Sequence, residues 1–240
     1  MDKTKVFIWI IFFSLFSIAA AVSFKLMDPR IEAATAFYPY TQELVENVYG
    51  KSFSNLSMVP TSQAFEDLVN DKVDVIIVTE PNDEQLKLLE DKDLVYRELF
   101  LEPLIIYVNK ENDLDNLSID LLKKIYYAGT ELNTYQLKRG SGSQTSFETI
   151  VKNNRIGNNH YEVDYMDEII DKVAEDKNGI AYAFSSFYFK QHCIDGIKII
   201  SINNKKFDEE DYPLQFKVYL IYDETNQKVS KLIKYLDKGE

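Results

Sequence analysis

Cysteine and histidine are nearly absent from this sequence of 240 residues. The single cysteine, Cys193, excludes an internal disulfide bond. With only His160 and His192 beside it, the chain has few side chains that bind zinc, haem iron or iron–sulfur clusters. We therefore expect no cofactor and no metal. Glycine and proline are also scarce, at 8 and 6 residues, and this composition is that of a folded globular protein rather than a disordered one.

Positive charge is in short supply as well. The 27 Lys and Arg residues face 39 Asp and Glu residues, which leaves a net charge of −12. Nucleic acid is therefore not an expected partner, because phosphate backbones are bound by clustered Lys and Arg. Hydrophobic residues make up 45% of the chain, which is enough for a core. A chain of this length forms one large domain or two small lobes.

The one long hydrophobic run lies at the N-terminus. About 19 uncharged residues, Val6–Phe24, come close to the ~20 that cross a bilayer as a helix. Lys3 and Lys5 precede the run and Ala19–Ala21 lie near its end, as in a secretory signal peptide. The run exceeds the usual ~7 to 15 residues of a signal-peptide core, so a cleaved signal and an uncleaved anchor are both open. We assign residues 1–30 to this segment and expect the rest of the chain outside the cytoplasm, either anchored or released.

Downstream of this segment the sequence alternates strands and helices, which is typical of an α/β fold. Val73–Val78 is a continuous apolar run that predicts a strand buried on both faces. Asn82 with Gln85 three residues later predicts a capped helix start, and Ser118 and Gly129 delimit another helix. Further strands are predicted over Leu104–Val108, Gly179–Ala183, Lys198–Ile202 and Lys217–Tyr222, and further helices over Tyr40–Tyr49, Ser146–Asn153, Asp167–Glu175 and Asn226–Leu236.

The most unusual segment is Arg139–Thr145, RGSGSQT, just before a predicted helix. Glycine lets successive backbone N–H groups converge, and a helix start adds unpaired donors and a positive dipole end. The hydroxyls of Ser141 and Ser143 supply further donors. The segment is suited to cradling a small anion, the alternative being a plain loop with a Ser helix cap. It matches neither the P-loop, nor GxGxxG, nor the GxSxG nucleophile elbow.

Two other helix starts carry hydroxyl groups. Thr35 leads into a helix that has Pro39 in its first turn, and Thr61 and Ser62 follow Pro60 at the start of another. Ligands of α/β proteins lie at the carboxyl ends of the strands. The three hydroxyl-bearing helix starts therefore predict a shared cleft.

Catalysis is not expected. His192 and Cys193 are neighbours in sequence, which does not make them a catalytic pair. Ser141 has no base near it in the sequence and no metal cluster accompanies it, so an esterase or phosphatase is disfavoured. The acidic run Asp208–Asp211 lacks the spaced ligands of a calcium loop and is interpreted as a solvated turn.

The order of these segments resembles the phosphate-type (PstS-like) solute-binding proteins of ABC importers, which have the type II periplasmic-binding-protein fold. The likeness covers nearly the whole chain after residue 30. The stretches that carry it are ATAFYPYTQELVENVYG, VPTSQAFEDLVNDKVDVIIVTEP, LEPLIIYVNKENDLDNLSIDLLKKIYYAG, GSGSQTSFE, DEIIDKVAEDKNGIAYAFSSFY, DYPLQFKVYLIYDE and KVSKLIKYLDKG.

The resemblance implies two α/β lobes that are joined by crossing strands and close about a hinge on a ligand between them. It assigns residues 31–103 and 213–240 to the first lobe and residues 104–212 to the second. By composition alone, the Asn- and Asp-rich stretch Asn109–Asn116 is the best candidate for a hinge or lobe boundary.

The resemblance also implies which residues contact the ligand. From the two lobes these would be Thr35, Ala36, Phe37, Thr61, Ser62, Ser141, Gly142 and Ser143. Glu80 falls near the family's acidic residue, which accepts the proton of hydrogen phosphate and so rejects fully ionised sulfate. Many members have an arginine where this chain has Leu137, and Arg139 is the nearest replacement.

The implied function is that of a monomeric, non-enzymatic, extracytoplasmic protein that captures a small oxyanion, with phosphate as the expected ligand, for an ABC permease. The alternative is a membrane-tethered sensor or interaction module that keeps the fold without phosphate binding. Leu137 at the arginine position is the departure that keeps this alternative open.

Overall fold

The computed structural model describes residues 28–89, 92–138, 140–151, 159–189 and 195–239. The apolar run predicted to be a signal or anchor lies outside the described residues, as do Arg139, His192 and Cys193. Within the described part of the chain, no helix is both long and apolar enough to cross a membrane.

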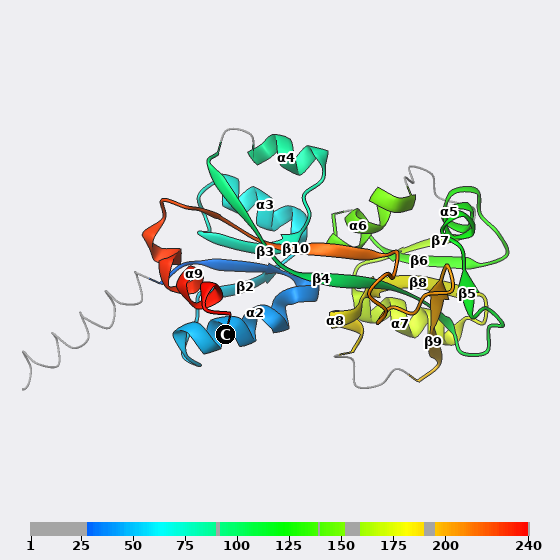
Figure 1. Ribbon diagram of the computed structural model, residues 1–240. Coiled ribbons are helices and arrows are strands. Elements are labelled where there is room, and N and C mark those ends of the chain that lie inside the picture. Colours follow the sequence, from blue (N-terminus) through cyan, green and yellow to red (C-terminus); the bar gives the residue numbers. More distant parts are fainter. Residues whose placement is uncertain (1–27, 90–91, 139, 152–158, 190–194, 240) are drawn as a thin grey trace, which may run out of the picture.

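Two α/β lobes share one long sheet and lie side by side (Figure 1). Lobe 1 contains β1 (Ile31–Ala34), η1 (Thr35–Phe37), α2 (Tyr38–Tyr49), β2 (Leu56–Val59), α3 (Thr61–Val69), β3 (Val75–Thr79), α4 (Asp83–Leu89), η2 (Gln227–Val229) and α9 (Ser230–Asp237). Lobe 2 contains β5 (Asn116–Leu117), α5 (Ile119–Ala128), β6 (Asn133–Leu137), α6 (Gly142–Val151), β7 (His160–Val163), α7 (Met166–Glu175), β8 (Gly179–Phe184), α8 (Ser185–Tyr188) and β9 (Ile197–Ile202).

The long strands β4 (Leu94–Asn109) and β10 (Gln215–Asp223) join the lobes. The strand order is β2-β1-β3-β10-β4-β8-β6-β7, and β9 also pairs with β4. Strand β4 pairs with β10 as far as Pro103 and with β8 from Leu104 onward. Both β4 and β10 are antiparallel to their neighbours, whereas β1–β3 and β6–β8 form the parallel parts of the sheet. The two-lobed α/β fold predicted from the sequence is confirmed.

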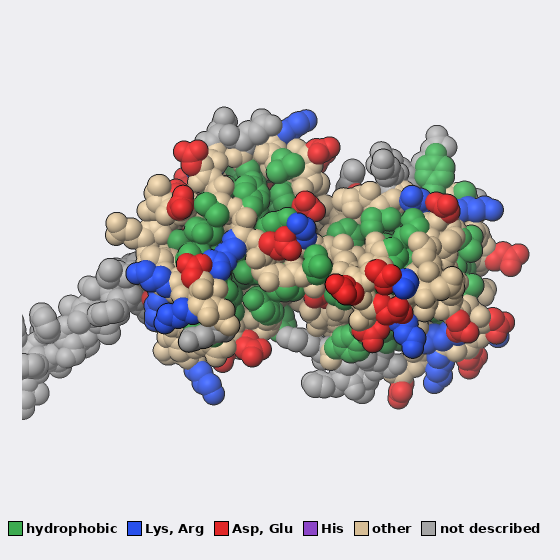
Figure 2. Space-filling model, viewed as in Figure 1, with side chains coloured by type: hydrophobic (Ala, Val, Ile, Leu, Met, Phe, Trp, Pro, Cys, Tyr) green, Lys and Arg blue, Asp and Glu red, His purple; other side chains and the backbone are tan. Residues whose placement is uncertain are grey.

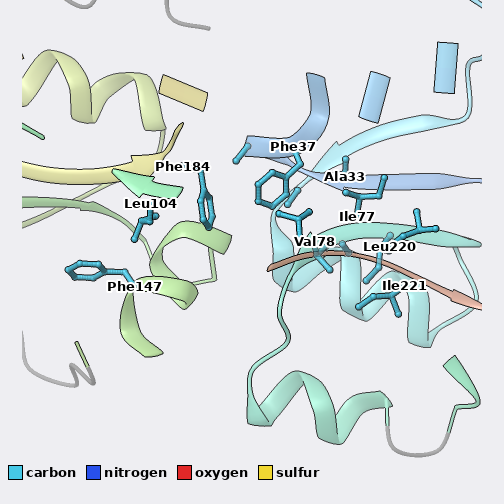
Figure 3. Packing of buried hydrophobic residues seen from close by; sticks show 14 of the residues in the cluster. Ala33, Phe37, Ile77, Val78, Leu104, Phe147, Phe184, Leu220 and Ile221 are labelled. Atoms are coloured by element: carbon cyan, nitrogen blue, oxygen red, sulfur yellow. The ribbon is translucent and has the colours of Figure 1, made fainter. Parts of the chain in front are cut away.

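Apolar runs place the central strands of each lobe. Strands β3 and β8, with sequences VIIVT and GIAYAF, are buried along their whole length. Such runs suit strands that are covered on both faces. Between the lobes, the rings of Phe37 from η1 and Phe184 from the end of β8 face each other with centroids 5.2 Å apart (Figure 3).

Local capping chemistry places two helices as predicted. The backbone N–H of Asn82 donates to the Gln85 side chain and the N–H of Gln85 donates to the Asn82 side chain, both at 2.9 Å. The Ser118 hydroxyl accepts from the N–H of Leu121 at 3.1 Å, and Gly129 follows α5 with a φ of 75°. These are the reciprocal cap and the glycine terminator that the sequence indicates.

The structure departs from the predictions in three ways. Helix α6 begins at Gly142 rather than at Ser146, because the Gly-Ser segment itself starts the helix. Strands β1, β2, β6 and β7 were not expected, since they have only 4 or 5 residues each. Asn109–Asn116 is not the hinge: the Asn109 side chain is buried in lobe 2, where it donates to the carbonyl oxygens of Val173 and Ala174 at 3.0 and 2.8 Å.

Candidate ligand-binding site

Three parallel strands of lobe 1 end at the same edge of the sheet. Strand β1 pairs with β2 and β3, so the chain leaves all three strands side by side. The residues found there are Thr35 after β1, Thr61 after β2 and Thr79 as the last residue of β3. This edge is where α/β sheets place their ligands.

In lobe 2 the loop after β6 leads into α6 at the same interlobe space. The Ser141 hydroxyl accepts from the N–H of Gln144 at 3.2 Å, so Ser141 caps its own helix. The side-chain oxygen of Gln144 in turn accepts a hydrogen bond from the N–H of Gly140 at 3.3 Å. The φ of 102° at Gly140 is a conformation that side chains other than glycine rarely adopt. Phe147 anchors the helix by stacking on Tyr182, at a centroid distance of 4.0 Å.

The starts of α3 and α6 touch across the cleft. The N–H of Ser62 donates to the carbonyl oxygen of Gly140 at 3.4 Å. A β-carbon on Gly140 would lie 3.0 Å from the Ser62 hydroxyl, and one on Gly142 would lie 2.6 Å from the Thr61 hydroxyl. Only glycines permit this approach. Two helix N-termini, each with unpaired N–H groups and a positive dipole end, therefore meet at one place.

Two hydroxyls at this meeting point have no hydrogen-bond partner among the residues that the structure describes. The Oγ1 atoms of Thr61 and Thr79 are both buried, with each residue 1% exposed. The Oγ1 of Thr79 lies 3.7 Å from the position that a β-carbon on Gly142 would take. A buried hydroxyl without a partner costs about 1–3 kcal/mol, so such groups mark a place built for a polar partner. Thr79 was not among the residues predicted from the sequence, although a polar residue at the end of the apolar run VIIV was a usable signal.

The other predicted residues of lobe 1 lie in different surroundings. Thr35 is exposed, while Ala36 and Phe37 are buried, the latter against Phe184. Glu80 is exposed, and its N–H donates to the carbonyl oxygen of Lys217 at 3.2 Å.

Glu80 belongs to the second of two grooves beside the cleft, a space of about 650 Å³ between the crossing strands β4 and β10 and helix α6. Burial and then the charge of Glu80 raise the pKa of Tyr219. A hydrogen bond to Glu98 raises the pKa of Lys217, which also lines this groove. The structure therefore brings Thr61 and Ser62 to Gly140 and Gly142, and it places Glu80 apart from them.

The predicted residues of lobe 2 lie together at the start of α6. Ser143 is buried with its hydroxyl 3.5 Å from that of Ser141. Leu137 ends β6 and packs against the core of lobe 2, and Arg139 lies outside the described residues.

An acidic groove of about 590 Å³ adjoins the meeting point, and the surface is notched between the lobes (Figure 2). Ser62 and Gly140 line it on either side. Its described lining also contributes carboxylates and no lysine or arginine; these are Glu66, Asp83, Glu84 and Glu148. No group of three or more His, Cys, Asp or Glu residues within the described ranges is arranged to hold a metal ion.

A buried carboxylate on the crossing strand β4 was also not predicted. Glu102, on β4, is 4% exposed and accepts hydrogen bonds from the Ser185 hydroxyl at 2.8 Å and from the N–H and hydroxyl of Ser186 at 2.7 and 2.6 Å. Its backbone pairs with Phe216 of β10, so Glu102 ties the crossing strands to the start of α8. Helix α8 in turn contacts η1 of lobe 1.

Two lobes on crossing strands, with facing helix starts between them, are the architecture of a bilobal binding protein, and residues 27–238 match the family profile of the PBP superfamily domain. The chain belongs to the PBP superfamily. The resemblance inferred from the sequence is thus confirmed at the level of family and fold. No curated protein sequence matches this PBP chain.

Phosphate transport proteins and regulatory domains are among the solved structures similar to this PBP chain. A protein from Clostridium perfringens, described as a phosphate ABC transporter substrate-binding protein with bound phosphate, has a TM-score of 0.71 and 16% identity over 86% of this chain and 91% of its own. An ABC-type phosphate transport receptor from Vibrio cholerae has a TM-score of 0.69 and 14% identity over 86% and 92%. The CcmR regulatory domain from Synechocystis, in complex with 2-PG, has a TM-score of 0.64 and 17% identity over 88% and 94%.

Proposed function

We propose that this PBP chain is an extracytoplasmic solute-binding protein that captures a small oxyanion, with phosphate as the first candidate, and delivers it to an ABC permease. The observation that carries the proposal is the meeting of two helix starts, at Thr61 and Gly142, across the cleft. Binding and release require no chemistry on the ligand, so we assign no catalytic residue.

The donors at this place suit an anion. The first N–H groups of a helix have no partner within the helix, and the dipole is positive there. The hydroxyls of Thr61, Ser62 and Ser143 add donors, and Ser141 holds the start of α6 in place. Thr35, at the same sheet edge, stays in the proposed set. Ala36 and Phe37 have apolar side chains, so only their backbone groups can contribute.

The negative charge of the molecule does not oppose this proposal at short range. At physiological salt a surface field decays over about 8 Å, whereas hydrogen bonds in a closed cleft act at contact. Leu137 cannot neutralise an anion, so we assign that role to Arg139. A charge-assisted hydrogen bond contributes about 1.5–3 kcal/mol, or roughly ten- to a hundredfold in affinity.

Isothermal titration of the purified chain with phosphate, sulfate and small organic anions tests the proposal. We expect binding to at least one anion and a ten- to hundredfold loss, on the order of one charged hydrogen bond, in Arg139→Ala. Lys138→Ala is the matched control, because Lys138 is exposed and pairs with Asp164 at 2.6 Å. No heat with any anion, or equal losses in both variants, would contradict the proposal.

A second function, that of a membrane-tethered sensor, is favoured by the similarity to regulatory domains such as that of CcmR. A sensor with an uncleaved anchor should stay with membranes after a high-salt wash, because apolar insertion is not screened by salt. Membrane retention combined with no response to any anion would favour this function. A mature protein that starts near residues 22–24 would instead indicate cleavage and release.

A further inference from the structure

The residue that ends β3 beside the facing helix starts is a threonine. Thr79 is buried, and within the described part of the chain its hydroxyl has no hydrogen-bond partner. It faces the α6 start together with the hydroxyl of Thr61. Helix α6 of lobe 2 contacts β3 directly. Thr79 therefore lies where the two lobes meet, on the same side as the proposed anion donors.

Glu80 is directed away from this point. Glu80 follows β3 directly, and its N–H still donates to the carbonyl oxygen of Lys217 on β10 at 3.2 Å. The extended backbone thus continues past Thr79, and successive residues of such a backbone point to opposite faces, so the side chains of Thr79 and Glu80 diverge. Glu80 is exposed and lines the second groove with Lys217 and Leu101, whereas neither Thr61 nor Gly142 lines that groove. The carboxylate that could demand a protonated ligand is thus separated from the helix starts.

We propose that Thr79, and not Glu80, faces the bound anion, and that the site takes sulfate and phosphate alike. This inference rests on the proposed function and defines its ligand class. A carboxylate can only accept a hydrogen bond, so it favours an anion that carries a proton and repels one that is fully ionised. A hydroxyl donates or accepts, so Thr79 pairs equally with an oxygen of hydrogen phosphate and with one of sulfate.

Titration of the full chain with phosphate and with sulfate, at one pH and ionic strength, tests the inference. We expect the two affinities to agree within about tenfold, the effect of one neutral hydrogen bond. Thr79→Val should weaken both anions by about two- to tenfold and leave their ratio unchanged. Thr79→Asp should weaken the binding of sulfate relative to that of phosphate by about a hundredfold, because it introduces a group that can only accept hydrogen bonds.

Thr225→Val is the matched control and should alter neither affinity, because Thr225 lies in an exposed turn bonded to Asp223. Thermal unfolding checks that each variant folds. If the buried aspartate prevents folding, Thr79→Ser, which should keep both affinities, and Thr79→Val together decide the matter.

The outcomes separate this inference from the proposed function. Phosphate binding that excludes sulfate overturns the inference alone, and loss of that preference in Glu80→Gln would identify Glu80 as the discriminating acid. Wild-type affinities in Thr79→Val also overturn it. The absence of heat with either anion overturns the inference and its oxyanion ligand class together.

Discussion

Glu32 and Asp67 form a buried carboxyl pair in lobe 1, on β1 and α3. They are 7% and 8% exposed. Burial, followed by the nearby charge of Asp67, raises the pKa of Glu32 from 4.5 to about 7. Hydrogen bonds from Lys72, at 2.7 Å, and from Gln63 lower the pKa of Asp67. Below neutral pH the pair therefore holds one proton, on Glu32.

The raised pKa of Glu32 sets the sign of its effect on stability. Between pH 4.5 and 7 the folded chain keeps a proton that the unfolded chain has lost, so stability is complete below pH 4.5 and falls as pH rises to 7. The shift corresponds to at most about 3 kcal/mol. Lys72 is 62% exposed beside the pair, so solvent screens it, and we expect about 1–2 kcal/mol.

Glu32→Gln removes the ionisation and keeps the shape of the side chain. At pH 5 we expect the variant to match the wild type within about 0.5 kcal/mol, and at pH 8.5 to exceed its free energy of unfolding by about 1–2 kcal/mol. Urea unfolding followed by circular dichroism measures both. Burial lowers the pKa of His160, which gives an opposite slope, but this contribution is common to both proteins and cancels in the difference.

Glu43→Gln, on the exposed side of α2, is the control, and it should change stability by less than about 0.5 kcal/mol at either pH. A difference between Glu32→Gln and wild type that stays constant from pH 5 to pH 8.5 would refute the reasoning. It would mean that Glu32 ionises alike in the folded and unfolded chains.

Three further predictions concern Gly142 at the cleft and the carboxylates of Asp74 and Glu102. Gly142→Ala places a β-carbon 2.6 Å from the Thr61 hydroxyl and forces that hydroxyl to move, so titration should show weaker anion binding, and wild-type affinity would contradict this. Burial acts to raise the pKa of Asp74, but hydrogen bonds from the guanidinium of Arg30, just before β1, outweigh it and lower this pKa to about 2. Asp74→Asn should cost about 1–2 kcal/mol at pH 7 in urea unfolding and less than about 0.5 kcal/mol at pH 2, where the wild type has lost most of the same stabilisation. Glu102→Gln removes one hydrogen-bond acceptor for the buried donors of Ser185 and Ser186, so thermal unfolding should show a free energy of unfolding lower by about 1–3 kcal/mol. The exposed Glu98→Gln on the same strand is the control and should show no loss.

Short-range chemistry determined much of the architecture. The apolar run at β3 and the caps at Asn82 and Ser118 specify their elements within a few residues, because burial on both faces and capping bonds depend on neighbours in the chain. The Gly-Ser segment indicated a helix start close by, which the structure places at Gly142 instead of Ser146. The segment order sufficed to recognise a family that the match over residues 27–238 confirms.

Long-range pairing decided the rest. The four-residue strands β1 and β2 form only because each pairs with a strand elsewhere in the chain. Whether Thr79 or Glu80 faces the helix starts depends on the register of β3 against β1 and β10, and a shift of one residue would exchange them. The bonds from Glu102 to the serines that begin α8 span more than eighty positions of sequence. Which polar group meets which is fixed by the sheet and the crossing strands, since no local pattern encodes the face to which a side chain turns.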